Sequence, residues 1–299
     1  MRGPRAQGIV LAFGTALISG VSVFVNSYGV RVVRDATVYT TAKNLVAAVV
    51  LILLVAGVRG RRPAPRLSRR QWAGLPAVAV VGGSVPFVLF FNGLAHASST
   101  HAAFVHKTLV LWVALLAVPL LGERLGLLQY VAIGLLLGGQ VALDGGLGGF
   151  RFGTGELMLL AATLLWAVEV IVVKRLLVAV TPDLLAVARM GLGVLLLIGW
   201  VAVSGHWSGL IGLSAAGWRW AALTGLLLAG YVATWYRALA LAPAVDVTAV
   251  LVVAAVITAL LNAVVKGTVV TPQAGIGIAL LVAGAGLAAL ARPQPVLAR

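Results

Sequence analysis

The sequence contains no cysteine among its 299 residues. Disulfides, thiolate metal sites and cysteine nucleophiles are therefore excluded. Charge is also scarce, because only 10% of the residues are Asp, Glu, Lys or Arg, against about 25% in soluble domains. The seven acids and four histidines are scattered and form no HExxH or phosphate-loop pattern. We therefore expect no catalytic centre, no metal and no cofactor, and we do not expect an enzyme.

Hydrophobic residues dominate the chain at 62%, and the mean hydropathy is +1.10. Apolar stretches of about 20 residues recur from end to end, which is the length that crosses a bilayer as a helix. These features predict an all-α integral membrane protein. Breaks at Gly, Pro and Arg clusters give ten candidate transmembrane helices, at 8–31, 37–58, 72–96, 101–121, 126–143, 154–178, 183–204, 217–241, 246–265 and 273–291.

The net charge of +15 is explained by the loops between these helices. With ten spans both termini share a side, and the loops and tails on that side hold thirteen basic residues against five on the other. Basic loops stay in the cytoplasm. The sequence therefore predicts a multi-pass protein of a bacterial-type inner (plasma) membrane with cytoplasmic termini. The charge reports topology and lipid contact, and no nucleic-acid partner is expected.

The two halves of the chain resemble each other at an offset near 145 residues. The segment FFNGLAHASSTHAAFV (90–105) resembles WYRALALAPAVDVTAV (235–250), and a similar alignment places Lys43 opposite Arg189. Each half holds five spans, an odd number, so the halves enter the membrane from opposite sides. The sequence predicts two inverted five-helix repeats, residues 1–148 and 149–299, an organisation typical of secondary transporters.

A known family shares these features. LLAVPLLGERLGLLQYVAIGLLLGGQVAL (115–143), LLAATLLWAVEVIVVKRLL (159–177) and TPDLLAVARMG (181–191) resemble the EamA-type members of the drug/metabolite transporter (DMT) superfamily. The resemblance covers essentially the whole chain. In the second half, Lys266-Gly267-Thr268 departs from the Gly-Glu-Arg turn at 122–124. The resemblance implies a central cavity faced by the third, fourth, sixth and eighth helices.

The expected function is alternating-access transport of a small organic metabolite, either proton-coupled or by exchange. The excess of positive charge inside the spans favours an anionic or amino-acid-like solute, and the aromatic residues favour an aromatic one. The alternatives are a multidrug or cationic-solute exporter of the same fold and a membrane-embedded lipid-modifying enzyme. The expected partners are the solute, the bilayer and protons; the glycine-rich fifth and tenth helices favour close packing within the fold or in a homodimer.

Lys107 is the first candidate for the solute site, because it lies about two turns into an apolar helix where a free ammonium is costly. It would bind a negative group of the solute, or pair internally with Glu169. His106 points about 100° away around the helix; it would carry a proton or pack against a neighbouring helix. Glu169 is the acid in the middle of a span, and would be a proton carrier or a partner of Lys107 or Lys43.

Lys43 and Arg189 occupy equivalent positions in the two repeats, which favours gating or helix anchoring over direct recognition of the solute. Arg237 and Asp246 are expected to form a structural pair at the inner surface. The remaining candidates are polar or aromatic side chains that would line the cavity or pack between helices and lipid: Asn26, Asn92, Trp112, Trp166, Tyr231 and Trp235.

Overall fold

The computed structural model describes residues 3–59, 67–97, 99–146 and 152–291. Within these ranges the chain is helical and contains no strand. Several basic residues used for the topology prediction lie outside the described residues: Arg2, Arg61, Arg62, Arg66, Arg151, Arg292 and Arg299. The all-α fold expected from the sequence is confirmed.

The helices of the first half are α1 (Pro4–Val33), α2 (Ala36–Arg59), α3 (Arg69–Val78), the π-helical segment η1 (Ala79–Ser84), α4 (Val85–His96), α5 (Ser99–Lys107), α6 (Leu109–Leu121) and α7 (Leu127–Leu143). Those of the second half are α8 (Thr154–Leu176), α9 (Pro182–Val203), the short α10 (Trp207–Ile211), α11 (Ala215–Leu241), α12 (Ala244–Leu251), α13 (Val253–Lys266) and α14 (Pro272–Leu290).

Each expected span coincides with one helix or with a run of helices broken within the span. Eight such segments are long and apolar enough to cross a membrane. Of the other two expected spans, α7 is a shorter apolar helix and α11 is a 27-residue helix packed along α1. The breaks are η1 in the third span, Thr108 in the fourth and Val252 in the ninth.

Proline explains the first of these breaks. Pro86 lies in the first turn of α4 and has no backbone N–H, so it cannot donate to the carbonyl of Gly82 four residues earlier. The helix widens into η1 directly before this point. A free carbonyl inside a bilayer needs another donor. The third span therefore presents the Gly82 carbonyl to neighbouring helices.

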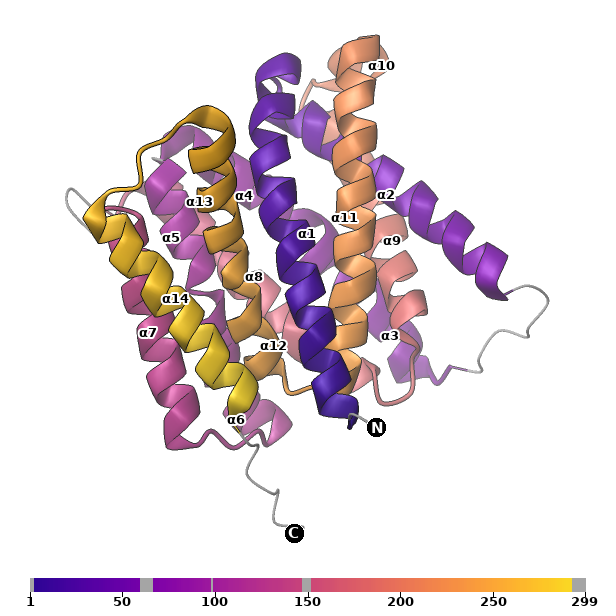
Figure 1. Cartoon of the computed structure of the whole chain (residues 1–299). Coiled ribbons are helices and arrows are strands. Elements are labelled where there is room, and N and C mark those ends of the chain that lie inside the picture. The colour runs from indigo at the N-terminus through magenta and orange to yellow at the C-terminus, as the bar shows by residue number, and fades with distance from the viewer. Residues whose placement is uncertain (1–2, 60–66, 98, 147–151, 292–299) are drawn as a thin grey trace.

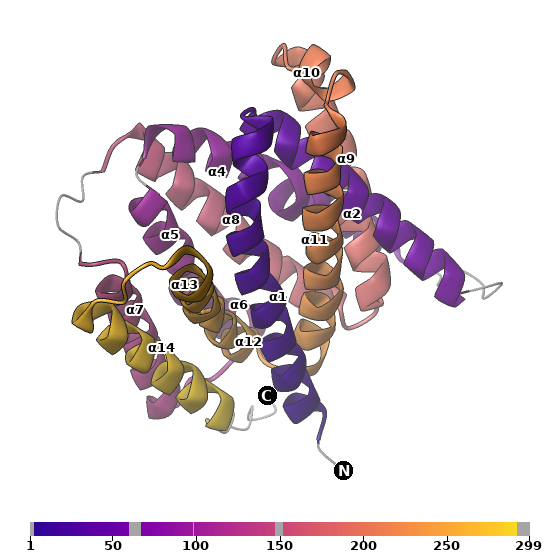
Figure 2. The same ribbon diagram turned by 45° about the horizontal axis from the view of Figure 1, so that its top comes forward.

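The two halves intertwine (Figures 1 and 2). The most extensive packing joins α1 and α2 to α11, α7 to α14, α4 to α8 and α2 to α9, and each of these pairs combines one helix from each half. Glycines permit the closest approaches: a Cβ added at Gly83 would lie 2.3 Å from the Arg189 carbonyl oxygen, and Gly193 packs on Gly83 in return. The fifth and tenth expected helices, α7 and α14, pack on each other, with Gly139 against Gly277.

The beginning of α1 and the end of α14 lie at the same end of the bundle (Figure 1). Arg5, in the first turn of α1, donates from Nη1 to the Ala289 carbonyl at 3.2 Å and from Nη2 to the Ala288 carbonyl at 3.2 Å, both near the end of α14. We call this end of the bundle the terminal end, and the other end the distal end.

Candidate functional site

Glu169 of α8 and Arg189 of α9 form a buried ion pair, with Nε and Oε1 3.0 Å apart and side chains 3% and 6% exposed. Tyr236 of α11 donates its hydroxyl proton to the same Oε1. The expected pairing of Glu169 with Lys107 or Lys43 was wrong. Arg189 lies 20 residues further along the chain, two helical turns into α9; η1 and α11 each pack on both α8 and α9 and bring the two charges together.

The carbonyl of Gly82 completes this cluster. It accepts hydrogen bonds from Arg189 Nη2 at 3.1 Å and from Trp166 Nε1 at 3.2 Å. A side chain at position 82 would collide with the Glu169 carboxylate, because a Cβ there would lie 2.2 Å from its carboxyl carbon. We call Glu169, Arg189, Tyr236 and the Gly82 carbonyl the ionic knot. It joins η1 of the first half to α8, α9 and α11 of the second half.

Lys107 is the last residue of α5, beside the break at Thr108. Its side chain is half-buried, and its ammonium makes no hydrogen bond to any described residue. The acid that attracts the Lys107 ammonium electrostatically is Asp144, at the end of α7. Burial raises the pKa of the Asp144 carboxyl, while a 2.7 Å hydrogen bond from Gln140 and the attraction of Lys107 act in the opposite direction.

His106 packs into an aromatic cluster with residues of α4 and α8. Its ring centroid lies 4.9 Å from that of Trp166 and 5.5 Å from that of Phe90. Phe87 packs edge-on against Trp166 at 5.6 Å. The buried Nδ1 of His106 has no hydrogen-bond partner among the described residues. The His106 ring is therefore packed against neighbouring helices, as one of the two expectations from the sequence had it, and its Nδ1 atom is left without a hydrogen bond to the described residues.

Lys43 of α2 is buried, with 8% of the residue exposed, and no described acid pairs with it. Its ammonium donates to Asn26 Oδ1 of α1 at 3.3 Å. It also lies 5.3 Å from the ring centroid of Phe91 and 5.5 Å from that of Tyr39. Phe91 in turn contacts Phe90, with ring centroids 5.7 Å apart, so Lys43 and the His106 cluster adjoin the same part of α4.

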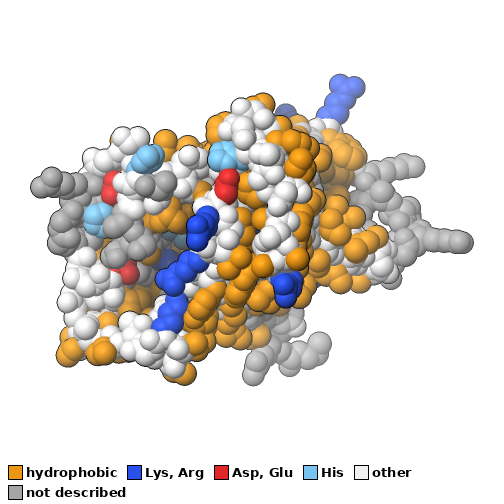
Figure 3. Space-filling model, turned by 90° about the horizontal axis from the view of Figure 1, so that it is seen from above, with side chains coloured by type: hydrophobic (Ala, Val, Ile, Leu, Met, Phe, Trp, Pro, Cys, Tyr) orange, Lys and Arg blue, Asp and Glu red, His pale blue; other side chains and the backbone are white. Residues whose placement is uncertain are grey.

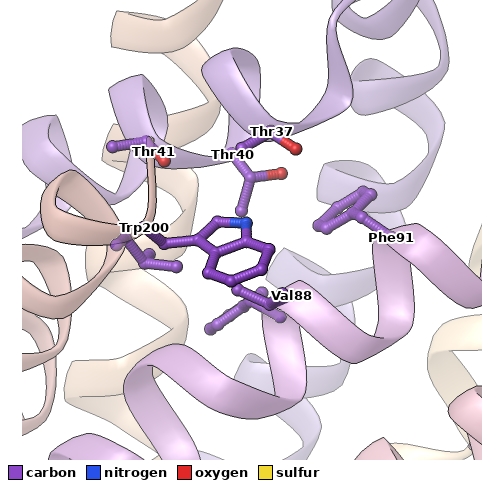
Figure 4. A pocket seen from close by; sticks show the side chains of 8 residues that line it. Thr37, Thr40, Thr41, Val88, Phe91 and Trp200 are labelled. Atoms are coloured by element: carbon purple, nitrogen blue, oxygen red, sulfur yellow. The ribbon is translucent and has the colours of Figure 1, made fainter. Parts of the chain in front are cut away.

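A small pocket lined by Phe91 lies between α2, α4 and α9 (Figure 4). Its lining includes Thr40, Thr41, Phe87 and Trp200. The buried hydroxyls of both threonines lack a hydrogen-bond partner among the described residues. These threonines were not predicted as site residues, because a threonine in an apolar helix usually bonds to a carbonyl of its own helix.

The other predicted site residues are spread over the bundle. Asn92 is exposed and bonds to a carbonyl of its own helix. Trp112 donates to Thr108 Oγ1 at 3.0 Å, and Tyr231 stacks on Trp235 with ring centroids 6.0 Å apart. Among the described residues, none of these side chains hydrogen-bonds to Lys107 or Lys43 or stacks against either ammonium.

Arg237 and Asp246 do not pair with each other. Arg237 bonds to Asp183 at 2.6 Å, and Asp246 bonds to Arg5 at 2.8 Å. The expectation failed because Asp246 lies within the first turn of α12, 1% exposed and turned toward α1, whereas Arg237 points to the surface of α11.

The two ends of the bundle are packed differently. At the terminal end, every residue of α12 is buried, and α12 packs against α6, α1 and α14. Towards the distal end, α13 packs mainly on α1 and more weakly on α14 among the described helices, and its last turn is exposed. Figure 3 shows the distal face, with Lys and Arg side chains across its middle. The described basic residues exposed there are Arg31, Arg34, Arg219 and Lys266.

Comparison with known proteins identifies the family. The model of the EamA-like transporter family matches residues 6–143 and again residues 153–290. The chain therefore belongs to the EamA-like transporter family, as the motifs of the sequence suggested, and is a multi-pass membrane protein built from two repeats. Family members are transporters, which agrees with the expectation that the chain is not an enzyme.

A solved structure supports the same fold. One chain, described only as "Crystal structure of protein", is similar over 96% of this chain and 99% of its own, with a TM-score of 0.77 and 20% sequence identity. At that identity the likeness establishes the fold alone. No curated protein sequence matches this chain significantly.

Proposed function

We propose that this protein is a secondary transporter of the inner membrane that moves a small anionic or amino-acid-like organic solute by alternating access. The observation that carries the proposal is the distribution of interior charge. Arg189 and Glu169 neutralise each other, whereas Lys43 lacks an acid partner and Lys107 lacks a hydrogen-bond acceptor among the described residues. A cation inside a membrane span that lacks an acid or an acceptor can bind an anionic group of a ligand.

The surroundings of Lys107 support a solute with more than one kind of group. Asp144 acts on Lys107 from α7, so an amino-acid-like solute would find an acid for its ammonium beside a cation for its carboxylate. His106, Phe90 and Trp166 supply an aromatic surface next to the same helix turn. This combination favours a solute with a charged head and an apolar or aromatic body.

The alternative functions are less well supported. A cationic-solute or multidrug exporter needs an unpaired acid in the interior; Glu169 is already held by Arg189 and Tyr236, and Asp144 lies near the positive charge of Lys107. A metal-dependent lipid-modifying enzyme needs a cluster of metal ligands, and no group of three or more His, Cys, Asp or Glu that could hold a metal ion occurs in the part of the chain that the structure describes.

Proton coupling, if the solute moves uphill, would use Glu169 or His106. Proton uptake by Glu169 requires its contact with Arg189 to open, so protonation and rearrangement of the ionic knot would be linked. Exchange of preloaded solute in proteoliposomes should then survive Glu169→Gln, while proton-driven accumulation is lost. Accumulation that keeps its pH dependence in this variant excludes Glu169 and leaves His106.

A ligand-stabilisation screen of the purified protein tests the solute class. The panel contains amino acids, carboxylates, phosphorylated metabolites and cationic drugs, and the unfolding midpoint is measured with each. We expect a carboxylate-bearing compound to raise the midpoint, since a ligand that binds only the folded state stabilises it. Stabilisation by cationic drugs alone would favour the multidrug alternative.

A further inference from the structure

The turn after α6 and the turn after α13 are equivalent in the two repeats, at an offset of 145 residues. Gly122 and Gly267 end the two helices with φ angles of 69° and 67°. The next backbone N–H, of Glu123 and of Thr268, donates over 3.3 Å to the carbonyl of Ala117 and of Asn262 respectively. The two turns therefore share their backbone conformation and differ in the side chain that follows the glycine.

At the terminal end, that side chain is a carboxylate that holds a helix of the other repeat. Glu123 Oε1 accepts from the backbone N–H of Ala244 at 2.6 Å, and Oε2 accepts from that of Val245 at 3.2 Å. These are N–H groups of the first turn of α12, which have no partner within the helix. The negative charge also lies at the positive end of the helix dipole. Glu123 thus binds the end of α6 to the beginning of α12.

At the distal end, the equivalent position cannot make this contact. Thr268 is exposed, uncharged and two carbon atoms shorter than a glutamate. The helix end that corresponds to Ala244 and Val245 is the beginning of α5, at Ser99 and Thr100. The packing at the two ends differs as well: α6 packs on α12, whereas α13 packs mainly on α1 among the described helices.

We infer that Glu123 is a latch that sets the resting orientation of the transporter, with the terminal end closed and the distal end open. The inference rests on the proposed alternating-access function. In an inverted repeat, the two orientations exchange the packing of equivalent helices at opposite ends. Only the orientation closed at the terminal end gains a carboxylate contact, so the equilibrium between the two is biased toward it. Glu123 is a positioning residue and touches no solute.

The magnitude follows from the chemistry of the contact. Hydrogen bonds to a charged acceptor are about twice as strong as neutral ones. Loss of the carboxylate, or addition of an equivalent one at the distal end, should change the population ratio of the two orientations by roughly tenfold or more.

Electron–electron distance measurements on the full-length protein in nanodiscs test the latch. The absence of native cysteines allows one spin-labelled pair, His96→Cys with Val264→Cys, two exposed positions near the distal ends of α4 and α13. The doubly labelled protein without a further substitution should mainly show the longer distance between the two labels, which corresponds to an open distal end. Glu123→Gln and Thr268→Glu should each raise the ratio of short to long distances by roughly tenfold or more.

Asp183→Asn is the matched control, because it removes an exposed carboxylate of the terminal end that pairs with Arg237. It should leave the distance distribution unchanged. Thr268→Glu changes an exposed residue, so it decides the question even if Glu123→Gln does not fold. An unchanged distribution in folded Thr268→Glu protein, or a shift to longer distances, overturns the latch.

The same samples separate the latch from the proposed solute class. If the latch variants shift the distances but no carboxylate-bearing compound binds, the latch stands and the solute class is wrong. If such a compound binds normally and the latch variants leave the distances unchanged, the latch is wrong and the solute class stands.

Discussion

The ionic knot predicts a strong and non-additive effect of removing either charge. Arg189→Met leaves the Glu169 carboxylate, 3% exposed, with Tyr236 alone; Glu169→Gln leaves the guanidinium, 6% exposed, without a counter-charge. At 3.0 Å and an effective dielectric constant of about 20, the attraction between the two charges is about 5.5 kcal/mol. This agrees with the roughly 3–5 kcal/mol that breaking a buried pair costs.

The double variant Arg189→Met/Glu169→Gln should recover most of the lost stability. It removes both buried charges, and replacement of a buried ion pair by uncharged groups is often neutral. The Gly82 carbonyl still receives its bond from Trp166. The assay is the free energy of unfolding of all four proteins in the same detergent, arranged as a double-mutant cycle. Additive losses, with the double variant less stable than either single variant, would show that the two side chains do not depend on each other.

Two further predictions concern the ends of the bundle. Burial raises the pKa of Asp144 above its ordinary value of about 4. At a pH between the ordinary and the raised pKa, the folded protein keeps a proton that the unfolded chain loses. The free energy of unfolding should therefore fall as the pH rises through this window. Asp144→Asn should abolish this loss in pH-dependent unfolding, and parallel curves for the two proteins would contradict the assignment. A reporter enzyme fused after Arg299 should be active in the cytoplasm, because basic loops are retained there. Activity in the periplasm would show that the protein has the opposite orientation in the membrane.

The sequence predicts the architecture well for a physical reason. A bilayer requires long apolar segments with internal backbone bonding, so span positions can be read from composition. The internal repeat then predicts the pairing of equivalent features, including the helix ends at Gly122 and Gly267. The resemblance of 115–143 to the EamA-type turn pointed to the family, and the family model confirms it.

Charge pairing could not be predicted in the same way. The partners of Glu169 and Asp246 depend on which helices pack together and on the rotation of each helix, and neither is encoded in a local pattern. One signal was available: Pro86 frees the carbonyl of Gly82, which required a donor such as Arg189. The position of Thr268 opposite Glu123 could also be read from the repeat, but its meaning depends on the contact of Glu123 with α12.

The central claim is that Lys107 binds a negative group of the solute, and the affinity of Lys107→Met protein for the stabilising compound tests it most directly. Methionine keeps much of the apolar stem, and Lys266→Met is the matched control, because Lys266 bonds to Ser27 at the exposed distal end. A charge-assisted contact contributes about 1.5–3 kcal/mol, so Lys107→Met should weaken binding by roughly tenfold to over a hundredfold while the control binds normally. Unchanged affinity in well-folded Lys107→Met protein would contradict the claim.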